Sequence, residues 1–414
     1  MDDGTTSGTP TSSVSHEGSL MRQGIRRKLI RVALAGGLSA TRALIAMVAD
    51  RQASPFSWGD MHALEDVGML IEEGAEVNAR DERGATVMHY AAAVHDPDML
   101  RLLIQRKGNV NAIELPSGKT VLMSAVGGLH PENVAVLLQH DADITKRDGM
   151  GATAMHYAAA GRHPAVLQLL IEAGGDVNAI EFVSGRTVLM SAVDGSQDDN
   201  VALLLNRRGA DADTHADVNA RDRNGATVMH HAAVQNTAIL DMLMNHGGDV
   251  NAIEVPSGRS VLMSAVLGHH HVYSERNVAV LLRRGADVHA RDAQGCTALH
   301  FAAKMTHARI LQQLIAAGGC VDAVDHLGVS VLMGAVQGSY MQAIRLLLAE
   351  GADVYAVDAL GRSVEQYISQ SRFVIHRVAE EIRLMLRWAS KKDWIGLVHA
   401  ASTDASRGGK WRHE

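Results

Sequence analysis

The chain has 414 residues, of which 47% are hydrophobic, 21% charged and only 3% aromatic, and its formal net charge is −7. The acidic balance argues against a strongly basic nucleic-acid-binding domain, and no stretch reaches the roughly 18 consecutive apolar residues of a membrane-spanning helix. Two cysteines, Cys296 and Cys320, exclude a multi-disulfide framework and favour a reducing compartment, cytoplasmic or nuclear.

The first 60 residues fall into two segments of different composition. Residues 1–19 are rich in Ser, Thr and Gly, which predicts a disordered tail. Residues 18–49 contain six basic and no acidic side chains, and their apolar stretch ends at Arg42. We predict N-terminal capping helices within 20–60, at about 24–35 and 40–50, because a repeat array needs polar ends. A signal anchor or an organelle transit segment in 20–50 is the alternative.

Internal repeats dominate the middle of the chain. A glycine followed two positions later by Thr or Ser recurs every 33–40 residues, too regularly for chance. A half repeat at 61–81 precedes the first copy, a degenerate copy starts at Gly361, and the longest intervals contain insertions at 211–217 and 269–276. The array therefore spans 61–368, and its complete copies start at Gly84, Gly118, Gly151, Gly185, Gly225, Gly258, Gly295 and Gly328.

Each copy predicts a glycine turn, a short helix, a loop and a second, more apolar helix. In the first copy, Gly84 suits the turn, Thr86 can cap the first helix, and Gly108 can end the second as a left-handed cap. One such helix pair cannot bury both of its faces. The copies must therefore stack on one another around a continuous core.

The repeated motifs carry a family resemblance. The segments GATVMHYAA (84–92), GATAMHYAA (151–159), GATVMHHAA (225–233) and GCTALHFAA (295–303) resemble the Thr-Pro-Leu-His-x-Ala-Ala signature of ankyrin repeats, although Val or Ala stands in place of its proline. The resemblance implies an all-α, ankyrin-repeat solenoid of helix–turn–helix units with projecting loops. It also implies a non-enzymatic protein-binding function and a concave, partner-facing side.

Two kinds of repeat alternate along the array. The copies at Gly118, Gly185, Gly258 and Gly328 have methionine where the other four have the motif histidine, so the duplicated unit is a pair of repeats. The resemblance implies that the histidines (His89, His156, His230 and His300) hydrogen-bond to the turn threonines as framework residues. A metal or proton-relay role is the less favoured alternative.

The loops before the glycines also alternate in charge. Equivalent loop positions of stacked repeats lie side by side. This predicts a ladder of exposed ion pairs that keeps the repeats in register, or a charge-patterned strip for an extended partner. The residues of this ladder are Arg80, Glu114, Arg147, Glu181, Arg221, Glu254 and Arg291.

The candidate partner-binding residues occupy three recurring positions. The resemblance places the residue after each glycine on the ligand-facing side, where Lys119, Arg186 and Arg259 favour an acidic partner segment, or are merely solvated charges left by duplication. Asp194 and Lys304 end first helices on the same side. The loop-tip residues Leu115, Phe182 and Val255 form a second contact row if they stay in water, or fold back on the neighbouring isoleucines.

The C-terminal region predicts one more helix. Val374, Val378, Ile382 and Met385 share one helical face, so residues 369–403 are expected to form a helical cap, with Trp388 and Trp394 as anchors and 404–414 as a disordered tail. The alternative is a helix that docks a partner or adaptor.

Signals for chemistry are weak. His269, His270 and His271 lie together in an insertion but lack further ligands at a convincing spacing, and no phosphate loop or catalytic motif is present. We therefore expect no catalytic residue, metal or cofactor, and a protein scaffold as the function. The alternative is a substrate-receptor or targeting subunit of a ligase, kinase or phosphatase complex, recruited through the C-terminal helix.

Overall fold

The computed structural model describes residues 40–53, 63–206, 215–268, 271–305, 308–370 and 376–390. The predicted tails, the helix expected at 24–35, most of the insertion at 211–217, Val374 and Trp394 lie outside the described residues. The chain divides after Phe182 into an N-terminal and a C-terminal unit. Each unit is described by itself.

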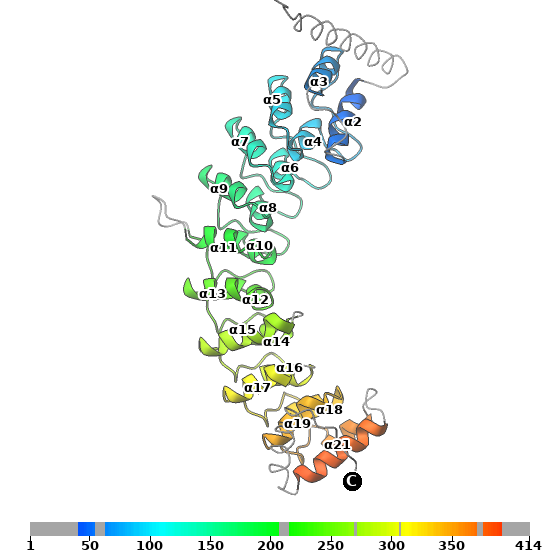
Figure 1. The fold of residues 1–414 in the computed structure, drawn as a ribbon, viewed down its shortest axis with the longest axis vertical. Coiled ribbons are helices and arrows are strands. Elements are labelled where there is room, and N and C mark those ends of the chain that lie inside the picture. The colour runs from blue at the N-terminus through cyan, green and yellow to red at the C-terminus, as the bar shows by residue number, and fades with distance from the viewer. Residues whose placement is uncertain are drawn as a thin grey trace, which may run out of the picture. The chain divides into compact units, whose positions relative to one another are not determined.

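The N-terminal unit is a stack of helix pairs (Figure 1). Helix α2 overlaps the second helix expected at the N-terminal end, and α3 lies in the predicted half repeat. The following copies each contribute a first and a second helix. The bounds are α2 Ala40–Ala53, α3 Ala63–Glu72, α4 Val87–Ala93, α5 Pro97–Gln105, α6 Val121–Gly128, α7 Pro131–Gln139, α8 Ala154–Ala160 and α9 Pro164–Glu172.

The C-terminal unit continues the same pattern and ends in a longer helix. Its first helices are α10 Val188–Asp194, α12 Val228–Ala233, α14 Val261–Leu267, α16 Ala298–Ala303, α18 Val331–Gln337 and α20 Val364–Gln370. Its second helices are α11 Asp198–Leu205, α13 Thr237–Asn245, α15 His271–Arg283, α17 Ala308–Ala316 and α19 Met341–Ala349, followed by α21 His376–Ala389.

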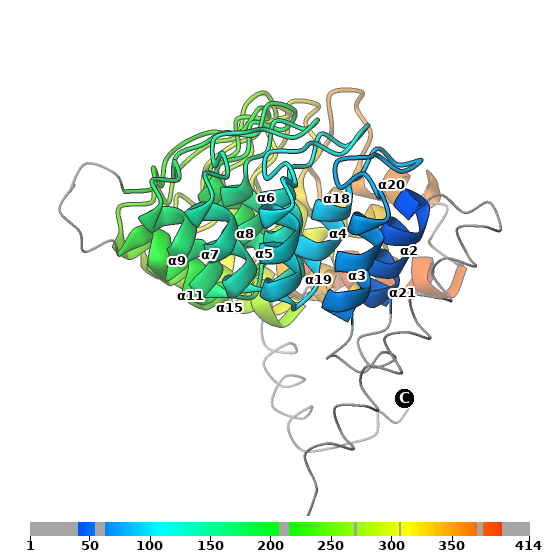
Figure 2. The same ribbon diagram turned by 90° about the horizontal axis from the view of Figure 1, so that it is seen from above.

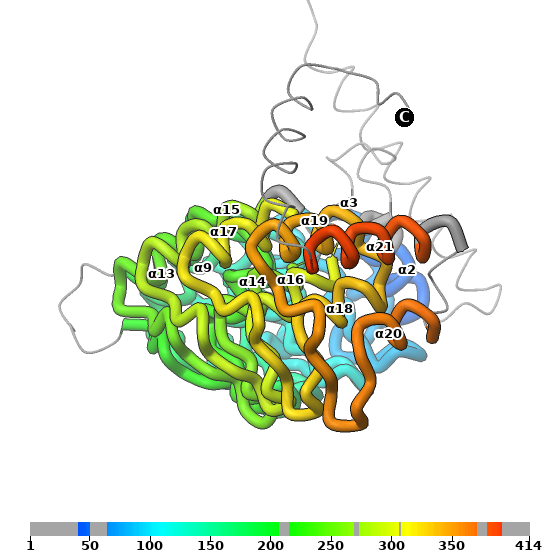
Figure 3. The backbone as a smooth tube through the Cα atoms, turned by 90° about the horizontal axis from the view of Figure 1, so that it is seen from below, coloured from blue at the N-terminus to red at the C-terminus, as the bar shows by residue number. Residues whose placement is uncertain are grey.

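Within each unit the helices form two rows, because first helices pack on first helices and second helices on second helices. The loops that precede the first helices project together on one side, as Figure 2 shows for the loops beside α4 and α6. Figure 3 shows the same arrangement in the C-terminal unit, with the second helices α13, α17 and α19 on one side and the loops on the opposite side. Among the described residues, β-structure consists of isolated antiparallel bridges, such as Ile113 with Thr120. The fold is all-α, as predicted.

Small and aliphatic side chains build the core. Ala91 and Ala92 of α4 and Ala158 and Ala159 of α8 are almost completely buried, and so is Leu100 of α5. Alanines on the first helices let neighbouring helices approach closely, which explains why so few aromatic residues are needed.

Threonine and histidine start the first helices of the odd copies. In α16, Nδ1 of His300 accepts a hydrogen bond from the backbone N–H of Thr297 at 3.0 Å, so Nε2 carries the proton and lies 3.3 Å from the carbonyl of Val329 in the next repeat. His89 and His230 make the same contacts with the carbonyls of Lys119 and Arg259. The expected framework role of these histidines agrees with this geometry.

Methionine replaces histidine in the even copies without loss of the helix cap. The N–H of Met123 still donates to the Thr120 hydroxyl at 3.2 Å, and that of Met333 donates to Ser330 at 3.3 Å. All four methionines at this position, Met123, Met190, Met263 and Met333, are buried. In the even copies the methionine side chain therefore occupies the buried space that the histidine ring occupies in the odd copies, but among the described residues it makes no hydrogen bond to the next repeat.

Buried asparagines on second helices were not predicted. The amide of Asn133 on α7 donates to the carbonyl of Ala92 at 2.9 Å, and that of Asn277 on α15 donates to the carbonyl of Ala233 at 2.8 Å. Both side chains are at most 1% exposed. They satisfy carbonyl groups at the end of a first helix in the preceding repeat, which that helix cannot satisfy itself.

Helix α21 packs against α19 and α20. Ile382 and Met385 are buried in this contact, and Arg345 of α19 lies 2.6 Å from Glu381. Leu384 and Trp388 on the same helix are about half exposed.

Candidate functional site

In each unit, the first helices and the loops that precede them lie on the same side of the stack. We call this side the first-helix surface, and it comprises α4, α6 and α8 in the N-terminal unit, α10, α12, α14, α16, α18 and α20 in the C-terminal unit, and the loops that precede these helices. Seven of the eight candidate binding residues lie on these helices or loops, and Lys304 is the C-cap residue that directly follows α16.

The basic residues that follow the glycines stand directly before the N-caps of the first helices. Glycine is needed there because Gly118 has φ +74° and a Cβ would lie 2.6 Å from the backbone of Gly149. Arg186 and Arg259 are exposed and Lys119 is half-buried, with its ammonium 5.0 Å from the centre of the Tyr157 ring. A cation at that distance from an aromatic face is weakly attracted to it.

Two of the predicted residues meet each other. Nη1 of Arg186 lies 3.3 Å from Oδ2 of Asp194, and Oδ1 of the same carboxylate lies 2.9 Å from Nδ1 of His231. On the other side of the imidazole, Nε2 is 3.2 Å from Oδ2 of Asp222. Sequence reasoning paired neither Asp194 nor Arg186 within the chain and did not single out His231.

The charge state of His231 follows from these neighbours. Burial of the ring lowers the pKa of His231, but hydrogen bonds and attraction from Asp194 and Asp222 outweigh burial, so the pKa is raised above its usual value. Burial instead dominates for His89, His230 and His300, whose pKa values are lowered. His89, His230 and His300 are therefore neutral, whereas the two carboxylates stabilise the imidazolium form of His231.

The counterpart of His231 is a tyrosine in three copies, at Tyr90, Tyr157 and Tyr367, and a phenylalanine, Phe301, in the Gly295 copy. Tyr157 donates its hydroxyl to Oδ2 of Asp148 at 2.6 Å, and Tyr367 donates to Asp358 at 2.8 Å. Burial is the largest cause that raises the pKa of Tyr367 to about 12, and the carboxylate adds to it. These tyrosines fasten the loop aspartate to the first helix. The sequence does contain a signal for His231, because it stands at the position that a tyrosine occupies in the copies of Tyr90 and Tyr157.

The loop-tip residues stay more than half exposed, with exposed fractions of 56% for Leu115 and 61% for Phe182 and for Val255. Each lies over the glycine of the preceding copy: a Cβ at Gly151 would come within 2.5 Å of the Phe182 ring. The guanidinium of Arg147 lies 4.4 Å from the centre of that ring. The tips therefore rest on backbone and expose their outer faces, rather than folding back on the isoleucines.

The arginines of the predicted charge ladder make a different contact from the expected one. Nη1 of Arg147 donates to the carbonyls of Gly151 at 2.7 Å and Ile180 at 2.6 Å, and Arg291 contacts Gly295 and Val324 in the same way. The glutamates Glu114 and Glu254 accept hydrogen bonds from Ser117 and Ser257. Backbone carbonyls of neighbouring loops, rather than carboxylates, thus hold these arginines.

Lys304 and the cysteines lie in the C-terminal unit. Lys304 is exposed, and its aliphatic chain runs beside α18, with Cε 3.0 Å from where a Cβ of Gly334 would stand. Cys296 is buried and Cys320 is exposed, and both are free. Burial raises the pKa of the Cys296 thiol, which makes it an unreactive thiol rather than a nucleophile.

One pocket of about 400 Å³ opens on the first-helix surface of the N-terminal unit. Its walls come from the end of α6 (Gly127) and its C-cap residue Leu129, from the loop before α8 (Met150), and from α8 itself (Tyr157, Ala160). Leu129 has left-handed φ of 62°, which is uncommon for leucine. This volume lies within the range of small ligand sites.

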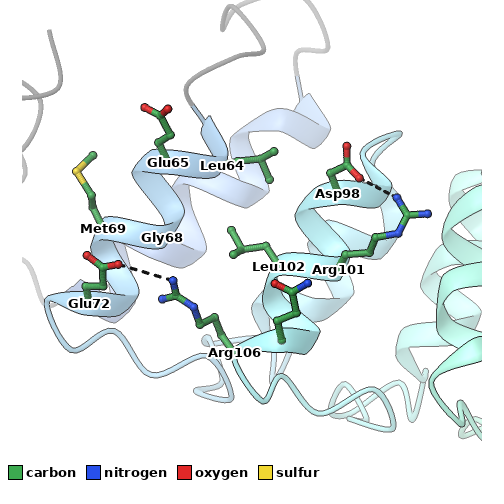
Figure 4. A pocket seen from close by; sticks show the side chains of 10 residues that line it. Leu64, Glu65, Gly68, Met69, Glu72, Asp98, Arg101, Leu102 and Arg106 are labelled. Atoms are coloured by element: carbon green, nitrogen blue, oxygen red, sulfur yellow. Dashed lines mark hydrogen bonds and ion pairs between the residues drawn. The ribbon is translucent and has the colours of Figure 1, made fainter. Parts of the chain in front are cut away.

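A second pocket, of about 520 Å³, lies between α3 and α5 on the second-helix side (Figure 4). Leu64 and Leu102 point into it in Figure 4. Its charged rim is paired within itself, since Asp98 lies 2.7 Å from Arg101 and Glu72 lies 3.7 Å from Arg106.

Among the described residues, no group of three or more His, Cys, Asp or Glu side chains is placed to hold a metal ion. No described helix is long and apolar enough to cross a membrane. The side chains of His269, His270 and His271 lie outside the described residues.

Comparison with known proteins agrees with the stacked helix pairs and their capped turns. A family model described as ankyrin repeats (3 copies) matches residues 60–148, 145–216, 212–292 and 269–358. The chain belongs to the ankyrin-repeat family. Ankyrin repeats mediate protein–protein interactions and are generally non-enzymatic.

Several ankyrin-repeat relatives are similar to parts of the chain. The nuclear factor NF-kappa-B p105 subunit of Gallus gallus is 29% identical over 53% of this chain and 22% of its own length. The E3 ubiquitin-protein ligase KEG of Arabidopsis thaliana is 27% identical over 58% of this chain and 15% of its own. The B-cell lymphoma 3 protein homolog of Mus musculus is 32% identical over 38% of this chain and 34% of its own. The chain thus matches about a third or less of each relative.

Proposed function

We propose that this ankyrin-repeat protein is a non-enzymatic scaffold whose first-helix surface binds an acidic segment of a protein partner. The observation that carries the proposal is the recurrence of a basic side chain, Lys119, Arg186 or Arg259, at the same position before three first helices. The exposed loop tips Leu115, Phe182 and Val255 supply apolar contact area beside these charges. A few such anchors dominate the free energy of binding in most interfaces.

The three basic residues are not equivalent as anchors. Arg186 shares its charge with Asp194, whereas Lys119 and Arg259 make no ion pair within the described residues. We therefore expect Lys119 and Arg259 to contribute more to binding than Arg186. Lys304, whose chain is already held beside α18, extends the basic surface in the C-terminal unit.

The test compares two charge reversals of equal size. One full-length variant carries Lys119→Glu, Arg186→Glu and Arg259→Glu, and the other carries Arg101→Glu, Arg283→Glu and Arg309→Glu on second helices. Partners captured from the source cells are quantified by mass spectrometry. The proposal predicts that the first variant loses partners that the second retains. Equal retention by both variants would reject a basic first-helix surface as the binding site.

A second candidate function rests on α21. Leu384 and Trp388 expose apolar surface on a helix whose buried face is already used by Ile382 and Met385. Such a helix could recruit a ligase, kinase or phosphatase complex, and one relative carries a ligase name. Because α21 contributes to the core, Leu384→Arg is a better test than deletion of 370–414. Loss of one class of captured partner at unchanged thermal stability would favour this function.

A further inference from the structure

The pocket between α6 and α8 exists because one side chain is missing. Gly127 stands at the exposed end of α6, and a Cβ added there would meet no atom within 4 Å. The residues at the same position of the other even copies are Asp194, Leu267 and Gln337. Three of the four paired repeats thus carry a side chain where the first leaves open space.

The facing position shows what that space holds when it is filled. In the N-terminal unit the position belongs to Tyr157, and in the next pair to His231. There the Asp194 carboxylate reaches His231 at 2.9 Å, so the chain supplies its own occupant. In the N-terminal unit Gly127 has no side chain that could meet Tyr157 in this way.

The polar atoms in the lining are already used. Oδ1 of Asp148 accepts hydrogen bonds from the N–H groups of Met150 and Ala152, both at 2.9 Å, and Oδ2 accepts from Tyr157. Glu181, the other carboxylate of the lining, is also partnered within the chain. The pocket therefore offers mainly apolar surface from Leu129, Met150 and the Tyr157 ring.

A charge marks one side of the pocket. The ammonium of Lys119 lies 5.0 Å from the centre of the Tyr157 ring and makes no ion pair among the described residues. A partner that fills the pocket brings its neighbouring residues close to this ammonium. A carboxylate there would form a charge-assisted contact, whereas a second cation would be repelled.

We infer that this pocket, the Gly127 pocket, receives one bulky apolar side chain of a partner peptide whose adjacent residue is acidic. The inference rests on the proposed function and specifies one contact between the partner segment and the first-helix surface. A volume of about 400 Å³ accommodates a Leu, Ile, Met or Phe side chain. Repeats with Asp194, Leu267 or Gln337 in place of glycine would not take the same anchor.

The test uses a displayed library of random peptides as the probe and the full chain as the target. Enriched peptides are synthesised, and their affinities are measured for wild type, Gly127→Leu and the control Gln337→Leu, which adds leucine at the same position of another repeat. We expect an apolar residue next to Asp or Glu in the enriched peptides. Gly127→Leu should weaken them about tenfold or more, and Gln337→Leu should not.

Charge exchange gives a second readout. Lys119→Glu should weaken the acidic peptides and strengthen versions whose acid is replaced by lysine. Gly127→Leu should keep or raise the melting temperature, because the site is open and leucine favours helix more than glycine does. If it does not fold, Ala160→Leu on α8 blocks the same pocket from an exposed position.

Full binding by Gly127→Leu, no enrichment of peptides, or enrichment without an apolar–acidic pair would each overturn the inference. Peptides that ignore Gly127→Leu but are weakened by Arg259→Glu or Phe182→Ala would leave the proposed function standing while removing this pocket from it. Peptides insensitive to all these changes would count against both.

Discussion

His231 shows how one substitution changes the chemistry of a repeat. The tyrosines at this position donate a single hydrogen bond to the loop aspartate, as Tyr157 does to Asp148. A protonated imidazole can donate from both nitrogens, and His231 has a carboxylate on each side. The exchange links two neighbouring first helices, α10 and α12, through a charge that depends on pH.

Replacing His231 by tyrosine should remove this pH-dependent term. Because the folded state raises the pKa of His231, its stabilisation is complete below the unfolded value of about 6.5 and is lost as the pH rises through the folded pKa. The difference in unfolding free energy, wild type minus His231→Tyr, should therefore decrease as the pH rises above about 6.5. Urea unfolding at each pH measures it, and a difference that grows with pH would contradict the assignment.

The framework histidines predict the opposite pH dependence. Burial lowers the pKa of His300, so acid protonates the unfolded chain first and stability is lost as the pH falls below about 6.5. His300→Gln offers a neutral replacement, since Gln366 already accepts the N–H of Ser363 at 2.8 Å at the equivalent place. This variant should cost about 1 kcal/mol at pH 7 and should lose less stability in acid. A steeper acid loss than that of wild type would be inconsistent with a neutral His300.

At the scale of elements, buried asparagines join the second helices α7 and α15 to the first helix of the preceding repeat. Asn277 is completely buried, its amide donates to the carbonyl of Ala233, and its oxygen accepts from Thr237 at 2.6 Å. These bonds fix the distance between α15 and the end of α12. Hydrophobic contact alone does not set that distance.

Asn277→Ala should destabilise the chain by about 1–3 kcal/mol, because a buried carbonyl and a hydroxyl lose their partner. Urea unfolding measures the loss, and Asn245→Ala, at an exposed position of α13, is the control. A loss below about 0.5 kcal/mol, the range of ordinary surface substitutions, would show that Asn277 does not hold the two helices together.

The elements themselves were largely predictable. Period, glycine turns and capping threonines are local signals, so helices such as α4 and α5 were expected close to their observed places. The arginine contacts were not, because a charge pattern cannot distinguish a carboxylate from a carbonyl in the neighbouring loop. Asn277 was missed because its partners lie 40–44 residues earlier in the chain.

At the scale of the whole molecule, each repeat is stabilised only by its neighbours, so an end cap protects the repeat before it. Truncation after Gln370 removes the buried side chains Ile382 and Met385, each worth about 1.5–3 kcal/mol. Amide hydrogen exchange should accelerate first in α19 and α20 and hardly change in α10. Uniform acceleration along the C-terminal unit would contradict nearest-neighbour stacking.

The sequence predicted which positions the candidate binding residues occupy, but it did not predict which side chains they contact. Register placed Lys119, Arg186 and Arg259 before first helices. It could not show that Arg186 meets Asp194, because that contact depends on side-chain reach. The pocket beside Gly127 was missed because the sequence does not show what the side chain at the equivalent position contacts; only the structure shows that Asp194 there reaches His231.

Site-specific photo-cross-linking tests the central claim most directly. A photoreactive phenylalanine analogue is placed at Phe182 or Ala160 on the first-helix surface, and at Gln139 or Gln312 on second helices, in the full chain within its source cells. Binding through the first-helix surface predicts partner adducts from the first two positions and few or none from the last two. Adducts of equal or greater yield from the second-helix positions, or none from the first-helix positions, would contradict it.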